Sequence, residues 1–139
     1  MDANQYLEIF IIEMKEGLET LSCQLPILKK DPENKDAAGE IFRVLHTFTG
    51  MSFVVGYKRI NRLTRAMKEV FFGVWDGRAE IKMKTSIVDI VFQCLDALEA
   101  YLMNIMKFQD EGTEDNEPII AKLNTVLKKI LVKEKVGVQ

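Results

Sequence analysis

The residues with the clearest chemical potential lie around His46, the single histidine of the 139-residue chain. A neutral imidazole nitrogen is a good nucleophile near neutral pH. Across residues 41–55, apolar side chains recur at spacings of three and four, which predicts an amphipathic helix with one face toward a core. His46 falls off that apolar stripe, on a face that also carries Gly50. We therefore expect an exposed imidazole with room for a large partner, and an ordinary surface histidine is the alternative.

A second reactive group is the amine of Lys68. Arg65, Phe72 and Trp75 lie at helical spacing from it, so they share its face of a helix predicted over residues 58–76. A lysine among aromatic side chains can serve as an amine nucleophile toward carbonyl substrates. This is the basis of one enzymatic hypothesis, a designed enzyme that uses Lys68. An ordinary solvated lysine is its alternative.

Composition and charge argue against several other classes of protein. Lysine and arginine total 19 and aspartate and glutamate total 21, without a basic run, so we expect no nucleic-acid partner. Cys23 and Cys94 lie far apart and fit no metal-ligand spacing, so we expect reduced thiols and no metal or other cofactor. The first residues are polar and acidic, and no apolar run reaches the length of a membrane span. We therefore expect a cytoplasmic protein without membrane contact.

Five helices are predicted to build the scaffold that positions His46. Their ranges are about 4–30, 36–53, 58–76, 85–108 and 117–134. Pro26 lies inside the first range, where we expect it to kink the helix or end it early. Residues 110–116 are acidic and are expected to form a solvated linker, and the tail from residue 133 is expected to fray.

The helical pattern predicts an all-α fold, because no stretch shows the alternation of a strand. Four antiparallel helices within residues 4–109 are expected to form an up-down four-helix bundle. The fifth helix, within residues 117–134, is expected to pack on that bundle. We therefore interpret residues 1–139 as a single helical-bundle domain.

A family likeness rests on several segments together, which are far more specific than any single motif. These segments are Met1-Asp2-Ala3-Asn4-Gln5-Tyr6-Leu7-Glu8-Ile9-Phe10, Asp31-Pro32-Glu33-Asn34, Glu40-Ile41-Phe42-Arg43, His46-Thr47, Gly50-Met51-Ser52, Leu95-Asp96-Ala97-Leu98-Glu99-Ala100-Tyr101-Leu102 and the acidic linker. In these segments the chain resembles the histidine-phosphotransfer domain at the N-terminus of the chemotaxis kinase CheA. The resemblance implies a bundle of that type with His46 as the exposed phosphoacceptor on the second helix. It also implies transfer of phosphate from the kinase domain of a dimeric CheA to a response regulator, as in two-component signalling.

Two departures from the family pattern fall at the site. The family motif H-x-[LI]-K-G reads His46-Thr47-Phe48-Thr49-Gly50 here, so Thr49 stands where a phosphate-stabilising lysine is expected. The family pattern L-T-H-x-x-E matches residues 63–68, so Arg65 and Lys68 stand where histidine and glutamate are expected. Lys68 cannot accept a hydrogen bond from the imidazole, as the glutamate would, and its charge opposes a growing positive charge on the ring. Arg65 and Lys68 are still able to hold a phosphate electrostatically.

Apolar side chains also gather on the faces near the site. If the face of Lys68 meets the face of His46, then Phe53, Phe72 and Trp75 lie around the phosphoacceptor position, where a soluble helix is normally polar. Such a cluster predicts an apolar pocket or docking patch.

The glycines inside predicted helices, such as Gly17 and Gly39, cost stability but would open space for a pocket. We therefore interpret the chain as a CheA-like phosphotransfer bundle with an altered site, an engineered or degenerate binding scaffold with an apolar pocket or patch near His46. Its partner would be an unknown protein or an apolar ligand. The alternative is a working phosphotransfer domain whose partners are a CheA kinase domain and a response regulator.

Overall fold

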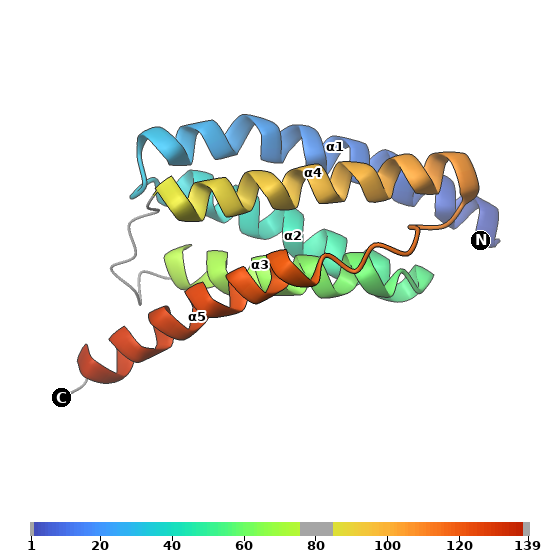
Figure 1. The fold of residues 1–139 in the computed structure, drawn as a ribbon. Coiled ribbons are helices and arrows are strands. Elements are labelled where there is room, and N and C mark those ends of the chain that lie inside the picture. The colour runs from blue at the N-terminus through green and yellow to red at the C-terminus, as the bar shows by residue number, and fades with distance from the viewer. Residues whose placement is uncertain (1, 76–84, 138–139) are drawn as a thin grey trace.

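The computed structural model describes residues 2–75 and 85–137, with side chains for residues 2–72 and 89–129. The helices of this described part are α1 (Ala3–Lys30), α2 (Lys35–Val55), α3 (Lys58–Trp75), α4 (Thr85–Phe108) and α5 (Glu117–Gly137). Figure 1 shows consecutive helices running in alternating directions, with α1 beside α4 and α2 beside α3. The α5 helix packs on α3 and α4. The predicted all-α fold, an up-down bundle with a fifth helix packed on it, is confirmed.

Polar side chains set where α1 and α2 begin. The Asp2 carboxylate accepts the N–H of Gln5 at 2.8 Å, and the Gln5 side-chain oxygen accepts the N–H of Asp2 at 3.1 Å. At the start of α2, the Asn34 side chain accepts the N–H of Ala37 at 2.9 Å. These bonds satisfy backbone donors that have no partner inside a helix. The α2 helix ends at Val55 and is followed by Gly56, whose φ of 93° is easily adopted only by a residue without a Cβ.

The α1 helix ends at the predicted residue 30, and the α5 helix runs further than the sequence predicts. The α1 helix does not end early at Pro26 but continues to Lys30. Leu25 and Leu28 on either side of the proline are buried, and their burial offsets the hydrogen bond that the proline removes. The α5 helix extends to Gly137, beyond the fraying expected from residue 133. The predicted end of the third helix at residue 76 lies outside the described residues.

The core is a continuous cluster of aliphatic and aromatic side chains from all five helices. The predicted apolar stripe of α2 is buried at Leu45, and apolar side chains at spacings of three and four from Phe10 to Leu28 form the buried face of α1. The prediction that Gly17 opens space for a pocket is wrong, because the Phe48 ring fills that space. Although each helix buries an apolar face, none in the described part of the chain is long and apolar enough to cross a membrane.

The connection from α4 to α5 is mostly exposed, as its acidic composition predicts, but one of its carboxylates is buried. Glu111 is only 4% exposed, and its two carboxylate oxygens accept the N–H groups of Arg59 and Ile60 at 2.8 and 3.0 Å. Both N–H groups lie in the first turn of α3, where backbone donors have no helical partner. The guanidinium of Arg59 also pairs with Asp115 at 2.8 Å. A carboxylate distant in sequence therefore caps α3.

Two tyrosine hydroxyls hold the same connection in place. Tyr57 donates a hydrogen bond to the Gln109 carbonyl at 3.1 Å, and Tyr101 donates one to the Glu114 carbonyl at 2.6 Å. The Asn116 amide donates to the Tyr101 hydroxyl oxygen at 2.8 Å. The connection thus ties the start of α3 to the end of α4 and the start of α5.

Candidate functional site

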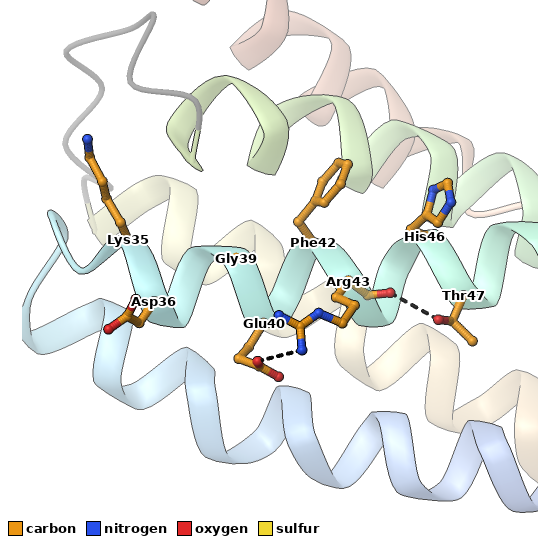
Figure 2. A pocket seen from close by; sticks show the side chains of 8 residues that line it. All are labelled: Lys35, Asp36, Gly39, Glu40, Phe42, Arg43, His46 and Thr47. Carbon is orange, nitrogen blue, oxygen red and sulfur yellow. Dashed lines mark hydrogen bonds and ion pairs between the residues drawn. The ribbon is translucent and has the colours of Figure 1, made fainter.

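His46 lies in the middle of α2, and its side chain is exposed, as predicted. The imidazole stacks on the ring of Phe42, one helical turn earlier, with ring centroids 6.2 Å apart and ring planes inclined by 19°. Figure 2 shows both side chains projecting from α2 toward α3. The imidazole is therefore accessible to a partner and has an aromatic ring beside it.

Two contacts set how α3 lies against α2 on either side of this site. In one, the hydroxyl oxygens of Thr49 on α2 and Thr64 on α3 are 3.0 Å apart. In the other, the ring centroids of Phe42 on α2 and Phe72 on α3 are 5.5 Å apart. Because the two helices run in opposite directions, these contacts fix the register of all residues between them.

Lys68 on α3 lies level with His46 in this register. Residue 46 falls between the two contacts on α2, and residue 68 falls between them on α3. The Lys68 side chain is half-buried, and Arg65, one turn away, is exposed. Among the described residues no ion pair involves either of these two cations. Their charges are therefore available to an anion that enters the site.

Thr49 connects the two helices and supplies no cation. Its hydroxyl oxygen lies 2.7 Å from the Leu45 carbonyl, in addition to its contact with Thr64. Its own carbonyl accepts hydrogen bonds from the Asn61 amide at 2.9 Å and from the Ser52 hydroxyl at 3.1 Å. The residue that replaces the family's lysine is thus part of the packing between α2 and α3.

Gly50 leaves open space one turn after His46. The residue is exposed, and a Cβ added to it would meet no atom within 4 Å. This confirms the room predicted beside the imidazole, through which a large partner can approach.

A groove of about 440 Å³ lies on the other side of His46, along the N-terminal half of α2. Figure 2 shows its lining, which consists of Lys35, Asp36, Gly39, Glu40, Phe42, Arg43, His46 and Thr47. Arg43 and Glu40 form an ion pair at 2.9 Å within it. The groove is thus lined by charged side chains together with the Phe42 ring, and His46 lies at its edge.

The aromatic residues predicted to form an apolar pocket near His46 do not line the groove. Phe53 is 77% exposed and lies two turns after His46 on α2. Phe72 is half-buried against Phe42. Trp75 is the last residue of α3, and its side chain lies outside the described residues. Phe53 is thus part of an exposed patch, whereas Phe72 belongs to the packing behind the imidazole.

Phe42 is the neighbour of the site that sequence reasoning misses. It lies four residues before His46, a spacing at which side chains on a helix surface meet. The apolar periodicity of α2 gives no sign of it, because Ile41 and Leu45 occupy the core-facing positions on either side.

A helical bundle with an exposed histidine in the middle of its second helix defines the class of this protein. Residues 5–104 match the Hpt domain family. The chain therefore belongs to the Hpt domain family.

Two similar curated proteins carry the name Chemotaxis protein CheA. The chain is 38% identical over 124 residues to Chemotaxis protein CheA of Bacillus subtilis. The aligned segment covers 89% of this chain and 18% of the relative. It is 36% identical over 121 residues to Chemotaxis protein CheA of Listeria monocytogenes. This alignment covers 87% of this chain and 19% of the relative. The chain thus spans about a fifth of the length of these relatives.

A solved structure has the same fold. It is the crystal structure of the phosphorylated P1 domain of CheA3 in complex with CheY6 from R. sphaeroides, with a TM-score of 0.80 and 20% sequence identity. The superposition covers 91% of this chain and 98% of the P1 domain. This likeness extends the family match to the arrangement of the helices.

Proposed function

We propose that this chain is the phosphotransfer domain of a CheA-like protein and that His46 accepts the phosphoryl group. The observation that carries the proposal is the exposed imidazole in the middle of α2, with open space at Gly50 beside it. Membership of the Hpt family and the similarity to proteins named CheA support the same role. The proposed donor is the kinase domain of a CheA, and the proposed acceptor is a response regulator.

Phosphoryl transfer requires that the reacting groups are correctly positioned and that the charge on the phosphoryl oxygens is stabilised, and it needs no further catalytic group. A ring nitrogen of His46 attacks the γ-phosphorus of ATP in the kinase domain. An N–P bond forms, and the P–O bond to ADP breaks with its electron pair leaving on ADP. The other ring nitrogen keeps its proton, so the ring carries a positive charge next to the phosphoryl anion. A carboxylate of the response regulator then takes the phosphoryl group, and the neutral imidazole is restored.

The cations of α3 provide electrostatic support for this proposal. Lys68 lies level with His46, and Arg65 is exposed one turn away. A positive charge near the phosphoryl oxygens stabilises the charge that they carry during transfer. In this proposal Lys68 and Arg65 supply the positive charge that the family's lysine supplies, and no carboxylate of the described residues bonds to the imidazole.

Labelling by a CheA catalytic core tests the proposal. The chain is incubated with the kinase domain of Bacillus subtilis CheA and ATP labelled at the γ-phosphate, with His46→Gln as the control variant. The N-terminal domain of the same kinase serves as the positive control. We expect label on the wild-type chain, none on His46→Gln, and loss of label when a CheY response regulator is added. An unlabelled wild-type chain beside a labelled positive control would contradict the proposal.

A binding scaffold without phosphotransfer is the second candidate, and it would be a degenerate or engineered form of the domain. The observation that favours it is the pair of exposed apolar residues Phe53 and Val54, which are 77% and 65% exposed on α2. Exposed aromatic groups of this kind are common anchors of protein interfaces. Binding of a CheY response regulator by a chain that takes no label, and its loss in Phe53→Ser, would favour this candidate over the first.

A further inference from the structure

We propose that Phe42 is a positioning residue for the imidazole of His46, in the place of the carboxylate that the family has on α3. The inference rests on the proposed function, because it concerns the orientation of the proposed phosphoacceptor. Its first observation is the stacked pair itself, with centroids 6.2 Å apart and planes inclined by 19°. A stacked neighbour one turn earlier restricts rotation of the imidazole about its bond to Cβ.

The second observation is that Phe42 is itself held. Its ring packs on Phe72 of α3, with centroids 5.5 Å apart and planes inclined by 46°. Both phenylalanines are half-buried, whereas His46 is exposed. A continuous series of three rings therefore runs from the α2–α3 interface to the imidazole. The orientation of the imidazole is thereby coupled to the packing of the two helices.

The third observation is the residue of α3 that lies at the level of the imidazole. Lys68 lies level with His46, and its ammonium group has donors but no acceptor for an imidazole N–H. Among the described residues no hydrogen bond or ion pair of His46 replaces that acceptor. Stacking orients the ring without occupying either nitrogen, so one nitrogen remains available for attack on phosphorus. The face of Phe42 also attracts the positive charge that the phosphorylated imidazole carries.

Substitutions at position 42 separate ring stacking from simple packing. Phe42→Leu keeps an apolar side chain and removes the aromatic face, whereas Phe42→Tyr keeps that face. Phe42→Met provides a second non-aromatic variant with a flexible side chain, in case leucine impairs folding. Phe108→Leu is the matched control, because Phe108 is a 71% exposed phenylalanine at the end of α4. Thermal unfolding of each variant establishes that it is folded.

The first readout is made on the unphosphorylated chain and does not depend on phosphotransfer. Ring ¹H and ¹³C signals of His46 are recorded by NMR with labelled histidine. We expect ring-current shifts and restricted ring motion in the wild type, Phe42→Tyr and Phe108→Leu. In Phe42→Leu and Phe42→Met we expect both signatures to be lost. Unchanged His46 signals in folded Phe42→Leu or Phe42→Met would overturn the inference.

The second readout is the initial rate of labelling by the kinase domain. We expect Phe42→Leu to lower kcat roughly two- to tenfold, which corresponds to the interaction energy of one aromatic pair. The KM for the chain should be unchanged. Phe42→Tyr is expected to restore the rate. A wild-type chain that is never labelled but whose His46 signals depend on Phe42 would refute the proposed function and leave the positioning intact. Labelling that is equally fast in Phe42→Leu would refute the positioning and leave the function intact.

Discussion

Gly17 of α1 lies directly against the ring of Phe48 of α2. A Cβ added to Gly17 would come within 2.5 Å of Cε1 and Cζ of that ring and within 3.0 Å of a methyl group of Val44. Phe48 is only 2% exposed, so its ring has little room to move away. The absence of a side chain at position 17 therefore lets α1 approach α2 closely.

We expect Gly17→Ala to lower the free energy of unfolding by about 1–2 kcal/mol, because overpacking outweighs the better helix propensity of alanine. Urea denaturation measures the change. Gly50→Ala is the matched control in α2, since a Cβ there meets no atom within 4 Å. It is expected to raise stability by about 0.5–1 kcal/mol. Equal stabilisation by both substitutions would contradict the close contact.

Removal of the Glu111 carboxylate is expected to destabilise the fold from the start of α3. Glu111→Ala leaves the N–H groups of Arg59 and Ile60 without their acceptor and should cost about 2–3 kcal/mol. Glu111→Gln keeps one acceptor oxygen and should cost less. Glu99→Gln removes a charge from an exposed position on α4 and should change stability by less than about 0.5 kcal/mol. Equal midpoints for Glu111→Ala and Glu99→Gln in urea would show that the cap contributes nothing.

The two cysteines are expected to differ in reactivity. Cys23 is exposed, whereas Cys94 is buried, and burial raises the pKa of the Cys94 thiol to about 12. Because the thiolate is the reactive form, a thiol reagent at neutral pH should modify Cys23 and spare Cys94. Mass spectrometry of the native and the denatured chain counts the modified sites. Rapid modification of both in the native chain would show that Cys94 is accessible.

The same burial predicts a loss of stability at high pH. Burial raises the pKa of the Cys94 thiol to about 12 in the folded chain, against an ordinary value of 9.0. The contribution of the neutral thiol to the free energy of unfolding is therefore complete below pH 9 and is lost as the pH rises toward 12. Burial also raises the pKa values of Tyr57 and Tyr101, which adds to the loss above pH 10. Thermal melts between pH 7 and pH 11 follow the decline. In Cys94→Ala the part of the slope that begins near pH 9 should be smaller.

Loss of the Lys68 charge is expected to weaken phosphorylation of His46. Lys68→Met should reduce the labelling rate about fivefold, the effect of roughly 1 kcal/mol from a partly solvated cation. Added salt should narrow the difference from the wild type, because ions screen the attraction. Lys15→Met, at an exposed position of α1, is the control and should label at the wild-type rate. A Lys68→Met rate equal to that of the control at low salt would exclude the electrostatic role.

The fold was predictable because periodic burial repeats along every helix. Stripes that include Leu21 and Leu45 identify the faces of α1 and α2 that meet the core, and the exposure of His46 follows from its place off the stripe. Contacts between residues that are far apart in the sequence leave no periodic pattern of apolar residues in it. The buried Glu111 looks like any residue of a solvated acidic run until α3 is placed beside it.

The site was predictable only in part, for a similar reason. The space beside His46 was predictable because Gly50 lies on the exposed face of α2, whereas the space at Gly17 faces α2 and is filled by the Phe48 ring. The direction in which an aromatic ring turns depends on neighbours from another helix. Phe72 therefore contacts Phe42 rather than lining a pocket, and the spacing along α3 cannot distinguish these two outcomes.

The cap on α3 also determines how much of the chain is needed to fold. The family match ends at residue 104, before the carboxylate that holds the first turn of α3. The two contacts of Glu111 join residues 51 and 52 positions apart, so each requires a long loop to close, and such contacts slow folding. We expect a chain cut at residue 104 to keep the matched sequence but to lose the carboxylate that caps the first turn of α3. The stable folding unit is therefore expected to extend beyond the segment by which the family is recognised.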